Sequence, residues 1–296
     1  MFKSVAELVT ICETENKKIY EVMIEQEMAV SKRSYEDIYK GMERNLEVME
    51  QAVERGLNGV QSPTGLTGMD AVKMREYIEK GNMLSGELLL DAVAKAVATN
   101  EVNAAMGLIC ATPTAGSAGV VPGTLFAVKN KLKATREDMV NFLFTTGAFG
   151  FVVANNASIS GAAGGCQAEV GSAAAMAAAA IVEMAGGSPK QSAHAFAICM
   201  KNMLGLVCDP VAGLVEVPCV KRNAAGASNA IVSADMALAG IESRIPTDEV
   251  IEAMYKIGQT MPSALRETGR GGLAGTKTGQ EMKERIFGSN AQSTFN

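Results

Sequence analysis

Apolar residues at helical spacing are the feature that most constrains how this chain can fold. Ser4 with Glu7, and Ser34 with Asp37, pair a helix-capping side chain with a carboxylate three residues later. Behind Ser34, one apolar face follows a helix that Gly56 is expected to end. The residues of that face are Ile38, Met42, Leu46, Met49 and Val53. The spacing predicts helices throughout the first sixty residues.

Later segments carry the same signals. The clearest helix start is Ser188, which is followed by proline at the first helical position and by Gln191 at the third. Alternating strand patterns are short and few, and no strand–helix–strand alternation repeats. The sequence therefore predicts an all-α, or strongly α-dominated, protein. Its later helices are expected over residues 83–103, 135–149, 188–204, 224–241 and 247–260.

Composition favours a single folded unit. The 296 residues are 48% apolar and 20% charged, which is typical of a well-buried globular protein. Ala, Gly and Met fill much of the interior, so helices can approach closely. No internal repeat or long linker divides the chain. We expect one compact helical domain over residues 1–288, carrying the active-site loops, and a flexible polar tail over residues 289–296.

Charge and hydropathy argue against two kinds of partner. The net charge is −5 without any run of Lys and Arg, so no nucleic-acid binding is predicted. The most apolar windows, 142–157 and 171–185, are shorter than the roughly 18–20 residues of a spanning helix, so we predict buried core helices and no membrane partner. The N-terminus has no secretory apolar block. This predicts a cytoplasmic protein whose six cysteines are free thiols or metal ligands.

Gly-rich loops interrupt the helical pattern and are the candidate binding segments. They cover residues 62–68, 112–119, 158–166 and 205–225. In the first two, hydroxyls lie beside glycines whose N–H groups can form a nest for a carboxylate. Ordinary turn chemistry explains any single one of these hydroxyls equally well, so only the set of loops favours a small anionic ligand. The candidate substrate-binding residues are Ser62, Thr64, Thr112, Thr114 and Ser117.

Three cysteines differ from the others in their surroundings. Cys166, Cys208 and Cys219 lie at loop–helix boundaries beside Gly or Pro, where side chains from distant segments can meet. No CxxC pair occurs, and the spacing matches no zinc finger. The residues alone leave open whether these thiols bind metal or are buried and inert. The other cysteines lie in or beside apolar segments, as small core residues do: Cys12, Cys110 and Cys199.

The remaining sequence patterns give weaker evidence for a functional site. The Gly-rich stretches 147–150 and 161–165 follow no clear strand, and no phosphate-loop pattern occurs, so nucleotide-binding fingerprints are unsupported. The single histidine, His194, lies inside a predicted helix, where a packed side chain is the more common role. Lys221 follows the third of the selected cysteines and is a candidate for orienting substrate or balancing negative charge. A solvated helix start is an equal alternative for Lys221.

The cysteine-bearing segments resemble a known enzyme family. The similarity lies in SGAAGGCQAEVGSAAAMAA, LGLVCDPVAGLVEVPCVKRNA and SPTGLTG, and it extends from the first loop to Gly288. These segments are similar to those of the oxygen-sensitive, iron–sulfur-dependent L-serine dehydratases. The resemblance implies that Cys166, Cys208 and Cys219 ligate a [4Fe–4S] cluster, which normally takes four thiolates. One iron is then left open as a Lewis acid.

The resemblance also implies a reaction and a partner. L-serine would lose water by β-elimination, giving pyruvate and ammonia, without pyridoxal phosphate, in amino-acid catabolism and gluconeogenesis. Single-chain relatives have a second domain with a Ser-Ser-His-Thr type motif thought to supply the base. This sequence lacks the motif and is similar to the alpha chain of the two-subunit form. We therefore expect a beta chain as partner, in a heterodimer or larger assembly, and weak or no activity without it.

Some relatives cap the fourth iron with a C-terminal cysteine, and no cysteine follows Cys219 here. The resting cluster is therefore expected to be open, solvent-ligated or capped by another group, and labile to oxygen. The general base is not identified and is expected on the partner chain. Two alternatives from other classes stay open. One is a non-catalytic helical partner-binding subunit with merely buried cysteines. The other is a zinc-dependent hydrolase that uses the same three thiols.

Overall fold

Thirteen α-helices, joined by loops and single turns of other helix types, make up the computed structural model, which describes residues 1–288. Within these residues there is no β-strand, only two isolated bridges, Gln61–Gly68 and Cys208–Arg266. The prediction of an all-α fold is confirmed. The predicted flexible tail, 289–296, lies outside the described residues.

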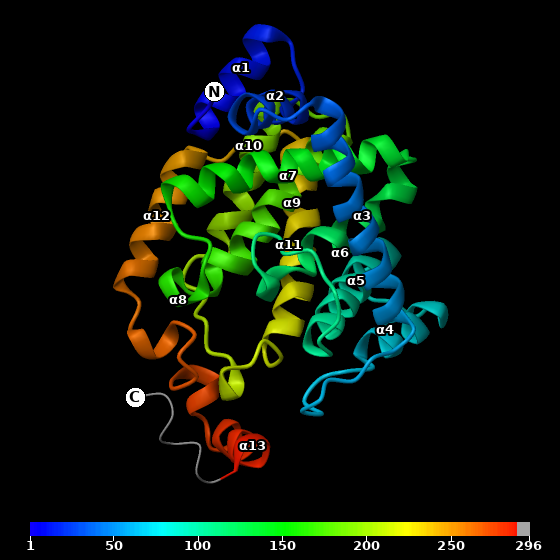
Figure 1. Ribbon diagram of the computed structural model, residues 1–296, viewed down its shortest axis with the longest axis vertical. Helices are drawn as coiled ribbons and strands as arrows, with labels where there is room; N and C mark the ends of the chain where they lie inside the picture. Colours follow the sequence, from blue (N-terminus) through cyan, green and yellow to red (C-terminus); the bar gives the residue numbers. More distant parts are fainter. Residues whose placement is uncertain (289–296) are drawn as a thin grey trace.

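Figure 1 shows α1 and α2 at one end of the molecule and α13 at the other, with the helical bundle between them. The helices are α1 (Val5–Glu15), α2 (Ile19–Ser31), α3 (Tyr35–Leu57), α4 (Asp70–Glu79), α5 (Glu87–Ala104), α6 (Val120–Leu132), α7 (Arg136–Asn156), α8 (Gly161–Gly164), α9 (Ser172–Met184), α10 (Pro189–Lys201), α11 (Cys219–Leu238), α12 (Thr247–Thr260) and α13 (Lys277–Phe287).

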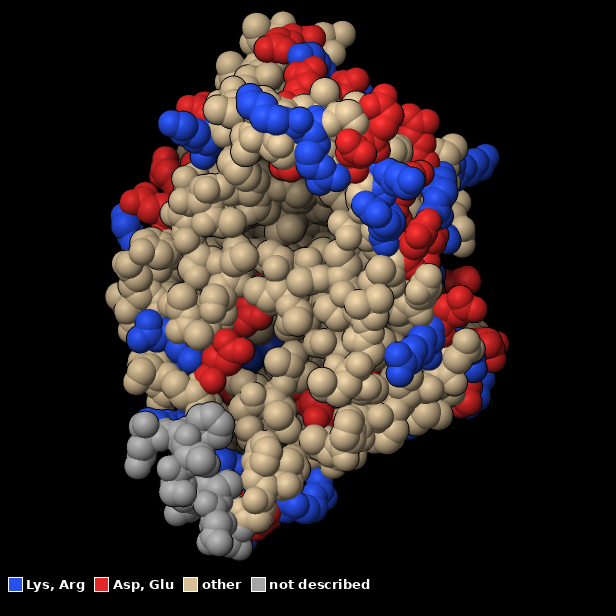
Figure 2. All heavy atoms as spheres, in the orientation of Figure 1, with Lys and Arg blue, Asp and Glu red and all other residues tan. Residues whose placement is uncertain are grey.

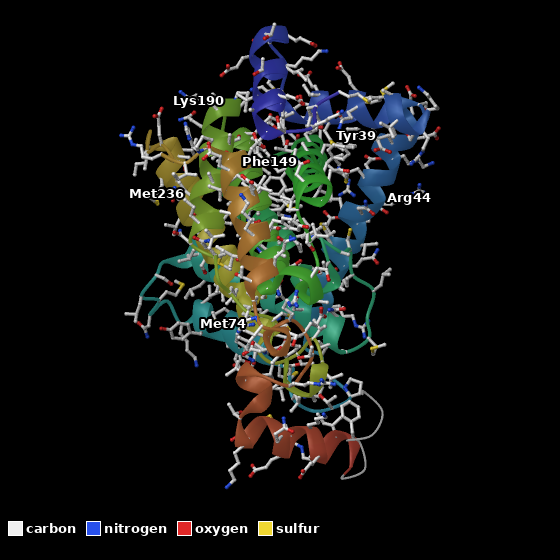
Figure 3. The ribbon with its side chains drawn as sticks, turned by 90° about the vertical axis from the view of Figure 1, so that its left-hand side faces the viewer. Tyr39, Arg44, Met74, Phe149, Lys190 and Met236 are labelled. Carbon is white, nitrogen blue, oxygen red and sulfur yellow. The ribbon has the colours of Figure 1, made fainter. Side chains whose placement is uncertain are left out.

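The centre of the bundle is α9, which packs against α6, α7, α10 and α11 (Figure 1). Every residue of α9 from Ser172 to Val182 is buried. Most of them are Ala, whose short side chain lets neighbouring backbones come close and has no rotamer freedom to lose. Beside α9, the rings of Phe149 and Phe196 stack with their centroids 5.3 Å apart. Phe149 lies inside the bundle, whereas Arg44 and Lys190 lie at its edges (Figure 3).

Side-chain caps start several helices where the sequence predicts them. Ser4, Ser34 and Ser188 each accept a hydrogen bond from the backbone N–H three residues later, at 3.1–3.2 Å. Each bond satisfies a donor that the first helical turn leaves without a partner. The bounds of α12 are those predicted. The two most apolar windows fall largely in α7 and α9, and none of the described helices combines the length and apolar character needed to cross a bilayer.

Several predicted boundaries differ in the structure. α7 continues to Asn156, past the end expected at residue 149, and α10 and α11 end at Lys201 and Leu238, before the ends expected at residues 204 and 241. Gly56 does not end α3, which continues to Leu57; a Cβ on Gly56 would lie 2.2 Å from the Ala98 carbonyl oxygen, so this glycine lets α3 and α5 cross closely. The helix expected from residue 83 starts after Gly86, whose φ of 83° no helix accommodates. The helix expected from residue 224 starts at Cys219, because the Val220 N–H already donates to the carbonyl of residue 216.

Candidate metal centre

Three cysteines from distant parts of the sequence line one cavity at the loop-rich end of the bundle. Cys166 precedes a turn of π-helix that continues into α9, and Cys219 is the first residue of α11. Cys208 lies in the extended segment between α10 and α11. The structure thus brings together the three side chains that the sequence singles out. The other lining residues are Gly116, Glu169, Val170, Pro210, Val215, Arg222 and Glu267.

A buried glutamine fixes the Cys166 segment against its neighbours. The Gln167 amide donates hydrogen bonds of 2.9 Å to the carbonyls of Gly164 and Met254, and its oxygen accepts one of 2.9 Å from the Gly205 N–H. The side chain is fully buried. Because all of its partners are backbone groups, Gln167 sets the position of the loop that leads to Cys208 relative to Cys166.

A buried asparagine does the same for the loop 112–119. The Asn223 amide donates to the carbonyls of Gly116, at 2.7 Å, and Cys219, at 2.9 Å. Its oxygen accepts a hydrogen bond of 3.0 Å from the Gly119 N–H. These bonds join the hydroxyl-rich loop to the first turn of α11, which carries the third cysteine.

Cys208 is held on its other side by the segment that follows α12. Its N–H donates to the Leu265 carbonyl at 2.9 Å, and its carbonyl accepts from the Glu267 N–H at 2.7 Å. Glu267 has a φ of 62°, in the left-handed region that few non-glycine residues adopt. The two backbone bonds therefore place Glu267 beside the cavity at a fixed register relative to Cys208.

An ion pair supplies positive charge beside the sulfurs. An Arg222 nitrogen lies 2.8 Å from an Asp209 carboxylate oxygen, and Arg222 also donates to the Val207 carbonyl at 2.7 Å. Asp209 is 3% exposed, so its charge depends on this arginine and on the Leu273 N–H, which donates to it at 2.7 Å. Arg222 lines the cavity and can offset negative charge that collects there.

A second carboxylate in the cavity belongs to Glu169, which the π-helical turn carries. Its oxygens accept a hydrogen bond of 2.5 Å from the Thr114 hydroxyl and one of 3.9 Å from the Cys208 thiol. Burial raises the pKa of Glu169 above its usual range. Glycines make room for it: a Cβ on Gly161 would lie 2.0 Å from one carboxylate oxygen, and one on Gly116 would lie 2.7 Å from the other.

The thiols are protonated when no metal is bound. Burial raises the pKa of Cys166 to about 11 and that of Cys219 to about 12, and it also raises the pKa of Cys208. Arg222 opposes the shift at Cys166. Since only a thiolate ligates metal, loading this site would release protons.

The spacing of the donors distinguishes between metal groups. Thiolates bound to one zinc ion at about 2.3 Å would be at most about 4.6 Å apart. The three sulfurs do not all meet even a 4.8 Å limit; among the residues that the structure describes, the set that does is Glu169, Cys208 and Glu267. In a cubane each thiolate binds a different iron, so wider spacing is required. Soft sulfur donors around one cavity, with a cation beside them, fit an iron–sulfur cluster better than a three-thiolate zinc site.

The loop 62–68 has its hydroxyls turned toward a protein carboxylate. Thr64 donates to both oxygens of Glu216, at 2.8 and 3.0 Å, and Thr67 donates to one of them at 2.9 Å. Ser62 lies 3.1 Å from the Thr64 hydroxyl. Glu216 is buried and lies three residues before Cys219. The loop is therefore tied to the cysteine-bearing segment through an internal carboxylate.

The loop 112–119 contributes the remaining hydroxyls. Thr114 faces Glu169, and the Ser117 hydroxyl donates to the Thr112 carbonyl at 3.0 Å. The Thr112 hydroxyl is buried and has no hydrogen-bond partner within the described chain. Thr112 is not among the residues that line the cavity, although Gly116 of the same loop is, so its orphaned hydroxyl is available to a ligand bound beside this loop.

Other singled-out residues lie away from the cavity. Lys221 pairs with Asp70 at the start of α4, and its side chain is 59% exposed, so Arg222 is the cation beside the sulfurs. His194 accepts a hydrogen bond from the Ser243 N–H at 3.2 Å and is not among the residues that line the cavity. Cys12 and Cys199 are buried in the core, as expected, and the third such thiol, at position 110, is half-buried.

Three carboxylates near the site, Glu169, Glu216 and Glu267, escaped the sequence analysis. Glu169 and Glu216 carry a usable signal, because each is a single charge within an apolar stretch, AEVG and LVEVP. A charge in such a place is buried only with partners. Glu267 carries no such signal, since it lies in a polar, Gly-rich segment.

Figure 2 shows the face of the molecule that carries α8 and the loops beside it. Charged side chains gather along the top and the edges of this face, and its middle is mostly uncharged. Exposed apolar residues are also found on the loop after α5, where Met106 is 85% and Leu108 70% exposed. Broad uncharged surface with exposed apolar side chains is typical of a protein–protein contact.

The fold and the site define an all-α protein with a buried three-cysteine cavity, and comparison with known sequences specifies the class. The family described as serine dehydratase alpha chain matches residues 14–274. The chain is 74% identical over 288 residues to the probable L-serine dehydratase, alpha chain, of Bacillus subtilis (strain 168), covering 97% of this chain and 96% of that one. It is 45% identical over 285 residues to the L-serine dehydratase, alpha chain, of Peptoniphilus asaccharolyticus, covering 96% and 97%. The chain belongs to the serine dehydratase alpha-chain family.

Longer relatives match as well. The L-serine dehydratase TdcG of Escherichia coli (strain K12) is 38% identical over 280 residues, which cover 92% of this chain but 61% of that protein. Part of the longer protein therefore has no counterpart in the aligned region.

Proposed function

We propose that this chain is the alpha subunit of an iron–sulfur L-serine dehydratase, which eliminates water from L-serine to give pyruvate and ammonia. The observation that carries the proposal is the convergence of Cys166, Cys208 and Cys219 on one cavity in a member of this family. With three thiolates for four irons, a [4Fe–4S] cluster would keep one iron open, and that iron supplies Lewis acidity toward the leaving hydroxyl. No pyridoxal phosphate takes part.

The protein groups would bind and orient the substrate around this centre. Thr114 places its hydroxyl against Glu169 of the cavity lining, and Thr112 on the same loop has a hydroxyl without a partner, so both would donate to the serine carboxylate. Ser62, Thr64 and Ser117 do not contact the substrate. Their hydrogen bonds stabilise the conformations of the loops 62–68 and 112–119. Arg222 balances the negative charge of the thiolates and of the substrate. Lys221 acts at most through Asp70 and α4.

We further propose that residues 1–288 form one catalytic domain and that a beta chain completes the site in the cytoplasm. Several observations support a partner. Two relatives aligned over nearly their whole length are called alpha chains, and the longer relatives contain additional sequence. The uncharged face and the exposed loop after α5 offer a contact surface (Figure 2). The general base is assigned to the partner, since no histidine lines the cavity within the described residues.

The test is pyruvate formation from L-serine under anaerobic conditions, by reconstituted alpha chain with and without a beta chain. Cys208→Ala should abolish turnover, whereas Cys110→Ala, which removes a thiol outside the cavity lining, should leave it within about twofold. Turnover by Cys208→Ala at the wild-type rate would overturn the proposal. Full turnover without the beta chain would overturn the assignment of the base to the partner.

The two alternatives make different predictions in the same samples. A zinc-dependent hydrolase would purify with stoichiometric zinc and no acid-labile sulfide, and the sulfur spacing argues against it. A non-catalytic subunit would bind no metal, and chelation would leave its melting temperature unchanged.

A further inference from the structure

We propose that the carboxylate of Glu267 is the protein ligand of the fourth iron, held in place in the resting enzyme and displaced when serine binds. This inference rests on the proposed iron–sulfur function and goes beyond it, because it assigns a ligand to the position that the three cysteines leave open. It concerns a residue that neither the sequence pattern nor the family comparison marks.

The first observation is the distance between donors. Ligand atoms of Glu267, Cys208 and Glu169 all lie within 4.8 Å of one another. Glu267 also lines the same cavity as the other two cysteines. The Glu267 carboxylate thus lies beside the Cys208 sulfur in the metal-free chain. Cys208 would bind one iron of a cluster, so Glu267 would serve the neighbouring iron by moving outward to the wider spacing that a cubane requires. Carboxylate is a harder donor than thiolate. On iron it is therefore replaced by another oxygen ligand more readily than a thiolate is.

Exposure and hydrogen bonding separate the two carboxylates. Glu169 is 7% exposed, and its oxygens are already engaged by Thr114 and by the Cys208 thiol. The backbones of Gly116 and Gly161 pack closely against its two oxygens. Glu267 is partly exposed, and its carboxylate makes no hydrogen bond or ion pair with another side chain in residues 1–288. Glu169 therefore suits a fixed wall of the site, and Glu267 suits a ligand that leaves toward solvent.

The backbone keeps Glu267 at the cavity even though its side chain is free. The backbone hydrogen bonds of Cys208 with Leu265 and Glu267 hold the two segments of chain side by side. Asp209, the next residue after Cys208, accepts the Leu273 N–H further along the same segment. Glu267 is thus anchored on both sides to the segment that carries a cysteine, and its carboxylate returns to the cavity without a loop having to close.

The exchange is balanced in charge and electrons. With the cluster bound, the Glu267 carboxylate would leave the iron as its iron–oxygen bond breaks, and an oxygen of serine, from the carboxylate or the hydroxyl, would bind in its place. No oxidation state changes, and the released carboxylate goes to solvent. A ligand that can leave protects the open iron from solvent and oxidants between turnovers.

The test uses the full chain, reconstituted anaerobically with ⁵⁷Fe and reduced, as wild type, Glu267→Gln and Glu267→Cys. Glu252→Gln, an exposed glutamate on α12, is the matched control. In water enriched in ¹⁷O, electron–nuclear double resonance detects water on an iron. We expect no ¹⁷O coupling in the wild type or in Glu252→Gln, and a clear coupling in Glu267→Gln, where solvent takes the vacated position.

A second readout is the rate at which ferricyanide converts the cluster to its three-iron form, followed by electron paramagnetic resonance. Glu267→Gln should lose the fourth iron several-fold faster than wild type, and Glu267→Cys several-fold more slowly, because a thiolate binds it more firmly. Equal ¹⁷O coupling and equal rates in wild type and Glu267→Gln would overturn the assignment of Glu267 while leaving the cluster intact. A wild-type chain that takes up no iron and sulfide would overturn the proposed function itself.

Discussion

The buried residues of α9 and those of the cavity beside it are stabilised in different ways. In α9 almost every buried side chain is apolar, most are Ala, and close packing stabilises them. In the cavity the buried groups are thiols, carboxylates, amides and an arginine, and each depends on a particular partner. The two regions are joined directly by the π-helical turn 167–171.

The difference separates what folds the protein from what serves its chemistry. The apolar region needs only volume and close approach, so its contribution to stability does not require a ligand. The polar region has three thiols whose pKa burial raises, and a bound metal group would take them as thiolates. Substitutions of apolar core residues away from the cavity should therefore change stability alone, and substitutions of residues that line the cavity should change metal uptake.

The largest expected effect is the loss of the metal group. Cys166→Ala or Cys219→Ala should remove essentially all stable cluster, because two remaining thiolates cannot hold it. The free energy of unfolding of the metal-free protein should change by only about 1 kcal/mol, since the thiols are neutral without metal. Visible absorbance and sulfide content measure uptake. A variant that retains wild-type sulfide content would contradict the assignment of these cysteines as cluster ligands.

Breaking the buried ion pair between Asp209 and Arg222 should lower both the stability of the protein and its uptake of the cluster. Asp209→Asn leaves Arg222 without its anion and should destabilise the metal-free protein by about 3 kcal/mol. Because Asp209 adjoins Cys208 and holds Leu273, cluster uptake should fall as well. Chemical denaturation and iron content provide the two measurements. An unchanged denaturation midpoint would show that Arg222 is satisfied without Asp209.

A glycine at a helix crossing should affect stability alone. Gly56→Ala places a Cβ against the Ala98 backbone and should cost about 2 kcal/mol, although Ala is the better helix former. Gly147→Ala on α7, where a Cβ meets nothing within 4 Å, is the matched control and should be neutral or stabilising by up to about 1 kcal/mol. Both variants should take up the cluster in full, and reduced uptake by Gly56→Ala would blur the separation of the two regions.

The smallest effect is expected at a helix cap. Ser188→Ala removes the acceptor for the Gln191 N–H and should destabilise the protein by about 1 kcal/mol, without altering metal uptake. Ser188→Asp keeps an acceptor and should retain most of the stability. Differential scanning calorimetry distinguishes the two variants, and equal melting temperatures would show that the cap does not contribute.

Local signals in the sequence predicted much of the fold. Capping residues such as Ser34 and Ser188 act within a few residues of themselves, so they locate helix starts from the sequence alone. α6 was not predicted, because it is buried over most of its length and so shows no alternation of polar and apolar faces. The role of Gly56 depends on a second helix, and no local pattern encodes that contact.

The candidate site was predictable only as far as residue type and resemblance allowed. The three cysteines were found through their Gly and Pro neighbours and through family similarity. The supporting groups Gln167, Asn223 and Asp209 act through hydrogen bonds to segments far away in the sequence. Glu267 reaches the cavity through pairing of its backbone with Cys208, a contact between residues 59 positions apart that only the folded chain reveals.

The most direct measurement of the central claim is quantitative Mössbauer spectroscopy of the anaerobically reconstituted wild-type chain with ⁵⁷Fe, together with a sulfide assay. The account predicts about four irons and four sulfides per chain, with one iron whose parameters differ from the other three and shift when L-serine is added. Four irons with equivalent Mössbauer parameters that do not change when L-serine is added, or a single metal ion without sulfide, would contradict the account.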